Sequence, residues 1–162
     1  MDYQILNTKK AFTLVELLIV ISVIGILTMA AIPVFTTAGS NQILVQNAEN
    51  LKSDIRGVQA KSLSGAVNGL NGYWGVRFVC NGGKAISYII GQPASPTNPL
   101  TDVSGQLKNF STGVYVECTA NFQVVFLKLT GKPADGIGVT IRVNDGNGHT
   151  QVIEINSQGN VQ

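Results

Sequence analysis

The sequence predicts an α+β protein, in which one long N-terminal helix packs on a mostly antiparallel β-sheet head. Three observations support this fold class. An unbroken apolar run near the N-terminus is long enough to form a transmembrane half of the helix, and an amphipathic stripe after it predicts a second half that packs on the head. Beyond the stripe, short segments rich in Val, Ile, Tyr, Phe and Thr alternate with turn residues, as expected of β-strands.

The apolar run extends from Phe12 to Phe35 and contains one ionisable residue, Glu16. Roughly 24 residues in a helix span about 36 Å, which exceeds the ~30 Å hydrocarbon core of a bilayer. A carboxylate within that core costs on the order of 2.5–3.5 kcal/mol on insertion scales, so it usually has a partner or a task. We therefore expect residues 12–35 to form a transmembrane segment and Glu16 to have a specific role.

The residues AFTLVELLIVISVIGILTMAAIP, from Ala11 to Pro33, resemble the class III leader and N-terminal helix of type IV prepilins and pseudopilins. The resemblance implies that residues 1–11 are a leader peptide, which prepilin peptidase removes by cleavage between Ala11 and Phe12, and that Phe12 is then N-methylated. It also implies that Glu16 pairs with the terminal amine of a neighbouring subunit during assembly, and that Pro33 occupies the proline position of the family. Ala11 stands where the family usually has glycine.

Two other interpretations of the run remain open. A secretory signal peptide has a short apolar core and a small-residue cleavage site, and Thr28-Met29-Ala30 before Ala31 fits such a site. The run is long for a signal peptide, however, and Glu16 would interrupt its core. An uncleaved single-span anchor is the second interpretation, and it gives Glu16 no purpose.

The second half of the helix, residues 36–64, carries apolar or small residues at alternating spacings of four and three, namely Leu44, Ala48, Leu51, Ile55, Val58 and Ser62. This spacing places them on one face, which we expect to pack against the sheet. Ser64-Gly65 predicts that the helix ends at about Leu63. Pro33 removes one backbone hydrogen bond and is expected to kink the helix between its two halves.

The head, residues 65–162, is predicted to contain six strands, at Tyr73–Cys80, Ala85–Ile90, Gly113–Thr119, Gln123–Leu129, Gly138–Val143 and Gln151–Ile155. Tight turns are expected where glycine supplies positive φ, at Asn81-Gly82-Gly83, Asp145-Gly146-Asn147-Gly148 and Ser157-Gln158-Gly159. The segment Gly91–Thr112 contains prolines at 93, 96 and 99 and predicts a long surface loop, which is either a contact site or without function.

Lys9 and Lys10 precede the apolar run, so the positive-inside tendency predicts a cytoplasmic N-terminus and a head outside the cytoplasm. That side of the membrane is oxidising, and the head contains two cysteines without the spacing of a metal site. We therefore expect a disulfide between Cys80 and Cys118. Closing a loop of ~38 residues would stabilise the head by about 3–4 kcal/mol. Two free thiols are the alternative.

Charge gives little indication of a polyanionic partner. Charged residues make up 12% of the chain, and the formal net charge is +2. The basic residues after the apolar run are spread along the sequence, at Lys52, Arg56, Lys61, Arg77, Lys84, Lys108, Lys128, Lys132 and Arg142. Because a nucleic-acid interface usually needs a dense basic cluster, nucleic acid is not expected as a partner.

No motif for catalysis, a cofactor or a metal is recognisable. His149 is the only histidine, and it lies in the turn sequence NDGNGHT without a GxSxG nucleophile motif nearby. Asp145 and Asn147 have a spacing found in calcium loops but lack the third ligand and the distal glutamate, so calcium is a minor alternative there. We expect no enzyme activity, no cofactor and no metal.

A second resemblance concerns the H-type pseudopilins of type II secretion and the FimT-type minor pilins. It rests on the helix end, Asp54–Ser62, and on the closing segment, Ile153–Gly159. Members implicated in DNA uptake carry basic residues after the closing glycine, whereas Gly159 is followed here by Asn160, Val161 and Gln162. DNA binding is therefore not carried over.

Together the resemblances imply a structural subunit of a type IV pilus-like filament, which is a pilus, a competence pseudopilus or a type II secretion pseudopilus. The implied partners are prepilin peptidase, other pilin or pseudopilin subunits, an inner-membrane assembly platform and the membrane itself. The implied location is the inner membrane, with one span and an external head, and then the extracytoplasmic filament. The alternative function is a binding module at the filament tip, whose loop at 91–112 contacts DNA, a surface or a secreted substrate.

Overall fold

The structure is a computed structural model that describes residues 12–65, 72–100 and 106–162, without the side chains of residues 30–38. The chain forms two compact units, Met1–Gly39 and Ser40–Gln162. Helix α1 (Leu14–Leu63) contributes its first part to the first unit and its last part to the second. The predicted leader, residues 1–11, lies outside the described residues.

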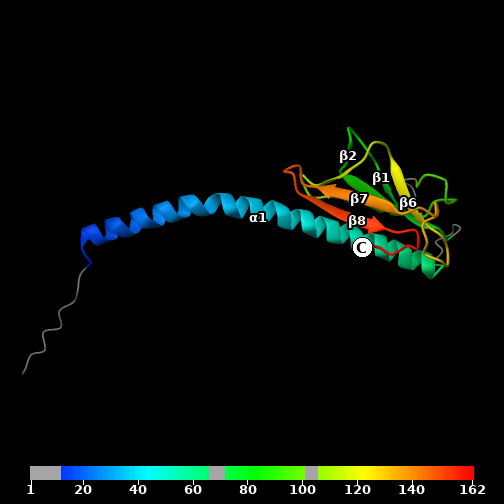
Figure 1. Cartoon of the computed structure of the whole chain (residues 1–162), viewed down its shortest axis with the longest axis horizontal. Coiled ribbons are helices and arrows are strands. Elements are labelled where there is room, and N and C mark those ends of the chain that lie inside the picture. Colours follow the sequence, from blue (N-terminus) through cyan, green and yellow to red (C-terminus); the bar gives the residue numbers. More distant parts are fainter. Residues whose placement is uncertain (1–11, 66–71, 101–105) are drawn as a thin grey trace, which may run out of the picture. The chain divides into compact units, whose positions relative to one another are not determined.

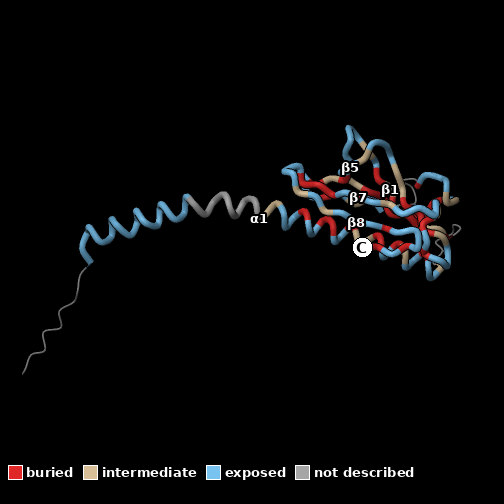
Figure 2. The backbone as a smooth tube through the Cα atoms, in the orientation of Figure 1, coloured by how far each residue is buried: buried red, intermediate tan, exposed pale blue. Residues whose placement is uncertain are grey.

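In the first unit, α1 carries apolar side chains on all its faces. Every residue from Phe12 to Met29 is exposed (Figure 2). Within the part of the chain that the structure describes, no helix is both long enough and apolar enough to cross a membrane. The helix continues through Pro33, so the proline does not end it. The predicted kink at Pro33 stays a prediction.

In the second unit, the amphipathic stripe of α1 is buried as predicted. Leu44, Leu51 and Ile55 have no exposed surface, and Ser62 is also fully buried. The Ser62 hydroxyl lies near two backbone oxygens of the sheet, those of Phe126 at 3.1 Å and Leu127 at 2.7 Å. The buried hydroxyl thus has acceptors for its proton, which avoids the cost of an unsatisfied polar group.

The predicted helix end is also confirmed. Helix α1 ends at Leu63, and Gly65 follows with φ of +64°, a conformation that glycine adopts without a steric penalty. The N–H of Ser64 still donates to the carbonyl oxygen of Ala60 at 3.0 Å.

The described part of the head contains eight strands: β1 (Trp74–Phe78), β2 (Lys84–Ala85), β3 (Ser87–Gly91), β4 (Gln106–Asn109), β5 (Tyr115–Glu117), β6 (Phe122–Phe126), β7 (Val139–Asn144) and β8 (Thr150–Ile155). They form two four-stranded sheets, sheet A in the order β4-β3-β1-β6 and sheet B in the order β2-β5-β7-β8. All strand pairs in the two sheets are antiparallel, so the predicted fold class is confirmed. Figure 1 labels α1 and most of these strands.

Two predictions about the strands were wrong in detail. The predicted strand Ala85–Ile90 is two strands, because the chain leaves sheet B after Ala85 and enters sheet A at Ser87. The predicted loop Gly91–Thr112 contains strand β4, which pairs with β3. In both places the strand assignment depends on pairing with distant residues, which local sequence does not determine.

The core of the head lies between α1 and the inner faces of the two sheets. It includes the fully buried Phe78 and Phe126 of sheet A and the nearly buried Ile141 and Ile153 of sheet B. The ring of Phe78 stacks on Phe122, with centroids 4.6 Å apart. Burying such side chains contributes about 1.5–3 kcal/mol each, so the stripe of α1 and the sheets stabilise one another.

The outer face of sheet A is also covered. Gly75 and Gly91 pair directly across β1 and β3, and Leu100 is fully buried with its Cδ1 3.3 Å from the place where a Gly75 Cβ would lie. Arg77 Nη1 donates to the carbonyl oxygen of Leu100 at 2.6 Å, and the Leu100 N–H donates to Gln123 Oε1 at 3.0 Å. This part of the predicted surface loop is therefore anchored to the sheet.

The C-terminal residues fasten the end of sheet B to α1. Val161 forms a bridge with Ile155. Arg56 Nη2 donates to the carbonyl oxygen of Val161 at 2.9 Å, and Gln59 Nε2 donates to the carbonyl oxygen of Gly159 at 2.7 Å. The helix end and the closing strand, which are far apart in sequence, are thus held together.

Candidate functional site

The N-terminus of α1 forms a helix cap from Thr13 and Glu16. Thr13 precedes the first helical residue, and its Oγ1 accepts a hydrogen bond from the Glu16 N–H at 3.2 Å. The same hydroxyl donates to Glu16 Oε2 at 3.5 Å, a long contact. Thr-x-x-Glu is the sequence of a capping box, although the Glu16 carboxylate here contacts the Thr13 hydroxyl; a carboxylate in the first turn also interacts favourably with the helix dipole. Glu16 therefore has a local role that was not predicted from the sequence, although the Thr-x-x-Glu spacing is visible there.

The carboxylate of Glu16 lies on an otherwise apolar surface. Its neighbours Val15 and Leu17 are 65% and 61% exposed, and Phe12, the predicted first residue after cleavage, is 81% exposed. Among the described residues, no ion pair includes Glu16. The residues from Phe12 to Met29 include no other charged side chain, so Glu16 is the one charge in this segment with which a cation could pair.

Two polar side chains farther along the described part of this unit, those of Ser22 and Thr28, are satisfied within the helix. The Ser22 hydroxyl donates to the carbonyl oxygen of Leu18 at 2.8 Å, and the Thr28 hydroxyl donates to that of Ile24 at 2.6 Å. Such back-bonding lets a hydroxyl enter an apolar environment. Exposure of a helix that is apolar on all faces to water is unfavourable, and lipid or neighbouring helices would remove this surface from water.

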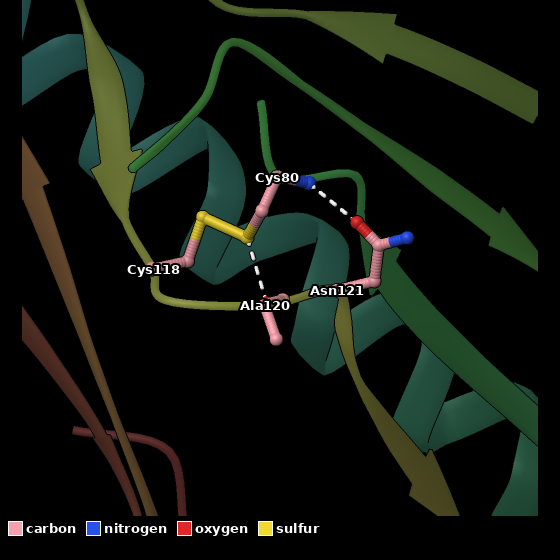
Figure 3. The surroundings of a disulfide bond; sticks show 4 residues. All are labelled: Cys80, Cys118, Ala120 and Asn121. Carbon is pink, nitrogen blue, oxygen red and sulfur yellow. Dashed lines mark hydrogen bonds between the residues drawn. A yellow bond between two sulfur atoms is a disulfide. The ribbon is translucent and has the colours of Figure 1, made fainter. Parts of the chain in front are cut away.

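The predicted disulfide joins Cys80 and Cys118, which are 38 residues apart (Figure 3). Cys80 follows β1 of sheet A and Cys118 follows β5 of sheet B, so the bond links the two sheets. The Cys80 N–H donates to Asn121 Oδ1 at 2.8 Å. The Cys80 sulfur also lies 2.8 Å from the carbonyl oxygen of Ala120, a close contact rather than a hydrogen bond because a disulfide sulfur carries no proton. Its role is to cross-link the head.

The turn with the only histidine is a structural feature. Asp145 Oδ1 accepts from the N–H groups of Asn147 at 2.8 Å and His149 at 3.2 Å, and its Oδ2 lies 2.7 Å from His149 Nδ1. Burial raises the pKa of Asp145, but the hydrogen bonds from His149 and the two backbone groups outweigh burial and lower the pKa overall. Because both carboxylate oxygens are engaged within the turn, the calcium alternative receives no support from this geometry.

A second polar cluster connects α1 with sheet A. Lys108 Nζ lies 2.7 Å from both carboxylate oxygens of Asp54, and the Tyr88 hydroxyl donates to Asp54 Oδ2 at 2.6 Å. Burial, then the hydrogen bond to the Asp54 carboxylate and its charge, raise the pKa of Tyr88. The cluster fixes edge strand β4 to the helix, and all three groups are engaged with one another.

The described residues contain no cluster of three or more side chains suited to a metal ion. A hollow of about 540 Å³ lies on sheet B near the disulfide, and its lining includes Lys84, Tyr115 and Arg142. Lys84 Nζ lies 4.2 Å from the centroid of the Tyr115 ring, a cation–π contact. The residues that line this hollow include no histidine.

The predicted site residues therefore fall into separate places. Ala11 lies outside the described residues, whereas Phe12 and Glu16 lie together at the start of α1. The disulfide lies in the second unit, whereas Phe12 and Glu16 lie in the first. At the start of α1, an exposed apolar surface surrounds a charged side chain that forms no ion pair with any described residue.

Comparison with known proteins identifies a known motif that includes the start of α1. Residues 6–32 match the family model described as the prokaryotic N-terminal methylation motif. No curated protein matches the sequence.

The fold is similar to two crystal structures of the type IV minor pilin FimU from Pseudomonas aeruginosa, strain PAO1. In space group P65 the identity is 16%, the TM-score is 0.55, and the match covers 74% of this chain and 90% of FimU. In space group P21 the identity is 14%, the TM-score is 0.54, and the coverages are 75% and 88%. The chain therefore carries a prokaryotic N-terminal methylation motif at residues 6–32 and has a fold similar to that of the type IV minor pilin FimU.

Proposed function

We propose that the protein is a structural subunit of a type IV pilus-like filament. The observation that carries this proposal is the coincidence of the methylation motif at residues 6–32 with a helix whose apolar residues are exposed on all faces from Phe12 to Met29. A helix of this kind is suited first to lipid and then to a bundle of identical helices, because both cover its whole circumference. No catalytic role is part of the proposal.

Maturation begins with the leader. Prepilin peptidase cleaves between Ala11 and Phe12 and so removes residues 1–11, and the new amine of Phe12 is methylated. The match to the methylation motif supports both steps. Cleavage creates a cation that is four residues from Glu16 in the same chain.

Before assembly, residues 12–35 hold the protein in the inner membrane, with residues 36–64 and the head, 65–162, on the external side. The proposed span includes residues 30–35, whose side chains lie outside the described set. Lys9 and Lys10 favour a cytoplasmic N-terminus. The disulfide between Cys80 and Cys118 agrees with a head in an oxidising compartment.

During assembly, the carboxylate of Glu16 pairs with the terminal amine of Phe12 in a neighbouring subunit. In an apolar filament core this pairing compensates for the burial of both charges, whereas a misplaced subunit leaves each unpaired at a cost of about 3–5 kcal/mol. The pair thus sets the axial position of each subunit. The assembly platform and other pilin or pseudopilin subunits are the partners of this step.

The charge of Glu16 can be tested separately from the helix cap at Thr13. Glu16→Gln keeps the side-chain length and the capping hydrogen bonds but removes the charge, whereas Thr13→Val removes the capping hydroxyl and keeps the charge. We expect Glu16→Gln to insert normally and to lose filament assembly, and Thr13→Val to retain most of it. In cells that express each variant, the amount of the protein in the membrane measures insertion, and the yield of filaments measures assembly.

The opposite pattern, in which Glu16→Gln assembles and Thr13→Val does not, would mean that Glu16 acts only through the helix cap. Normal filaments from both variants would remove Glu16 from assembly altogether.

The alternative function, a tip binding module that uses the loop at 91–112, receives less support. Leu100 is buried against sheet A, and Gln106–Asn109 form strand β4, so much of this segment is needed for the fold. A deletion would therefore unfold the head rather than remove a ligand contact. Residues 101–105 lie outside the described residues.

A further inference from the structure

The fold gathers three lysines that are spread in sequence. They lie on the end of α1 and on the loop after β6, and with two leucines they form what we call the distal patch: Lys61, Leu63, Lys128, Leu129 and Lys132. All five side chains are exposed. Figure 1 shows the end of α1 beside this loop, at the end of the second unit that is farthest along α1 from Ser40.

Backbone and side-chain contacts hold the patch together. The N–H of Leu129 donates to the carbonyl oxygen of Ser62 at 3.0 Å. The Lys128 side chain packs over Gly72, with its Cδ 3.0 Å from the place where a Cβ would lie. The Leu63 side chain covers Gly131 in the same way, with Cγ at 2.8 Å. The helix end and the loop therefore form one surface.

No acid that the structure describes forms an ion pair with a lysine of the patch. Among the described residues, the ion pairs involve Lys52, Lys108 and His149, and none includes a lysine of the distal patch. The nearest acid in sequence is Asp135, whose Oδ1 accepts a hydrogen bond from the N–H of Ile137. Lys61 Nζ lies 4.6 Å from the centroid of the Trp74 ring, a contact that keeps its positive charge.

Leu129 is the unusual member of the patch. Its φ of +64° is the only positive value among the non-glycine residues described, and its side chain is 67% exposed. A leucine rarely adopts this conformation because it is unfavourable. Since the side chain is exposed, burial of apolar surface offsets little of this unfavourable free energy. Leu129 lies between Lys128 and Lys132 in sequence. This combination of an apolar side chain and two cations suits a surface with anionic groups outside and an apolar layer beneath them.

We propose that the distal patch docks on the surface of an anionic lipid bilayer. The three lysines match the negative headgroups, and Leu129 reaches toward the acyl boundary. A nucleic acid fits less well, because binding of single strands relies on stacking of bases on open aromatic faces, and Trp74 is only 8% exposed with Lys61 over its ring.

The test uses the full chain in phosphatidylcholine discs, with the head free to bind added vesicles. It relies on the proposed function only in that the apolar half of α1 inserts into the disc. Failure to insert would contradict the proposed membrane anchor, whereas normal insertion without docking would contradict the distal patch. Co-flotation of the discs with vesicles of phosphatidylglycerol or of phosphatidylcholine measures docking.

We expect co-flotation with phosphatidylglycerol only. Lys61→Gln and Lys128→Gln should each weaken it about fivefold, since a lysine near an anionic surface is worth about a factor of five. Leu129→Gly should weaken it about tenfold while keeping the fold, because glycine accepts the positive φ. Lys84→Gln, on sheet B, is the matched control and should leave docking unchanged.

Three results would overturn the proposal: equal co-flotation with both lipids, full docking in the lysine variants, or full docking of Leu129→Gly. If the lysine variants alone lost docking and a DNA duplex competed with the vesicles, the patch would be a site for nucleic acid instead. Thermal unfolding of every variant, followed by Trp74 fluorescence, confirms that the head is folded in each comparison.

Discussion

Gly159→Ala tests how the closing segment is held against α1. Gly159 has φ of +89°, and a Cβ there would overlap the carbonyl oxygen of Gly131 and come within 2.6 Å of Gln59 Nε2. Gln59 Nε2 now donates to the carbonyl oxygens of Gly131 at 2.8 Å and Gly159 at 2.7 Å. The substitution therefore strains the backbone and displaces the group that joins the loop, the closing segment and the helix.

The magnitude follows from these two effects. A left-handed conformation costs an alanine about 1–2 kcal/mol, and each of the two hydrogen bonds contributes about 0.5–1.5 kcal/mol. Together these contributions predict a loss of about 2–5 kcal/mol in the free energy of unfolding. Gly148→Ala is the matched control, because Gly148 has φ of +94° but no atom within 4 Å of the place where a Cβ would lie. It should lose only about 1–2 kcal/mol, the cost of the backbone conformation.

Urea unfolding of the full chain in detergent micelles measures both variants. Trp74, the only tryptophan and 8% exposed, reports the unfolding of the head by its fluorescence. If Gly159→Ala and Gly148→Ala lost the same free energy, the cost would come from the backbone conformation alone, and the role assigned to Gln59 would be refuted.

Three further predictions concern the head. Cys118→Ser should lower the free energy of unfolding by about 3–4 kcal/mol under oxidising conditions and have little effect beside reduced wild-type protein, as urea unfolding would show. Leu100→Ala should cost about 2–5 kcal/mol, because the side chain is fully buried over Gly75, and a loss below about 1 kcal/mol would contradict the anchoring of this segment. The lowered pKa of Asp145 stabilises the folded head above about pH 4, and this stabilisation is lost as the pH falls through the folded pKa. Unfolding of Asp145→Asn should thus depend less on pH below about pH 4 than that of the wild type, and parallel profiles would contradict the shift.

The parts of the fold that depend on local sequence could be predicted. The buried stripe from Leu44 to Ser62, the helix end at Leu63 and the glycine turns follow from periodicity and backbone preference. The pairing of Cys80 with Cys118 follows from their number once the compartment is inferred.

The parts that depend on distant partners could not be predicted. Strand β4, with the sequence QLKN, has a single apolar residue and becomes a strand because β3 offers a free edge. The transfer of the chain between sheets at Ile86 and the burial of Leu100 likewise depend on contacts across the sheet.

The candidate sites show the same division. The methylation motif could be identified from sequence because its residues are contiguous. The distal patch could not, because Lys61 and Lys128 are far apart in sequence and come to one surface only through the hydrogen bonds of Ser62 with the loop after β6.

The N-terminal sequence and intact mass of the protein, purified from the membranes of its own cells, test the proposed function most directly. We expect a chain that begins with methylated Phe12 and contains the Cys80–Cys118 disulfide. A chain that begins at Ala31, or one that still begins with Met1, would contradict it, because Glu16 would then be lost or would have no neighbouring amine at Phe12 to pair with.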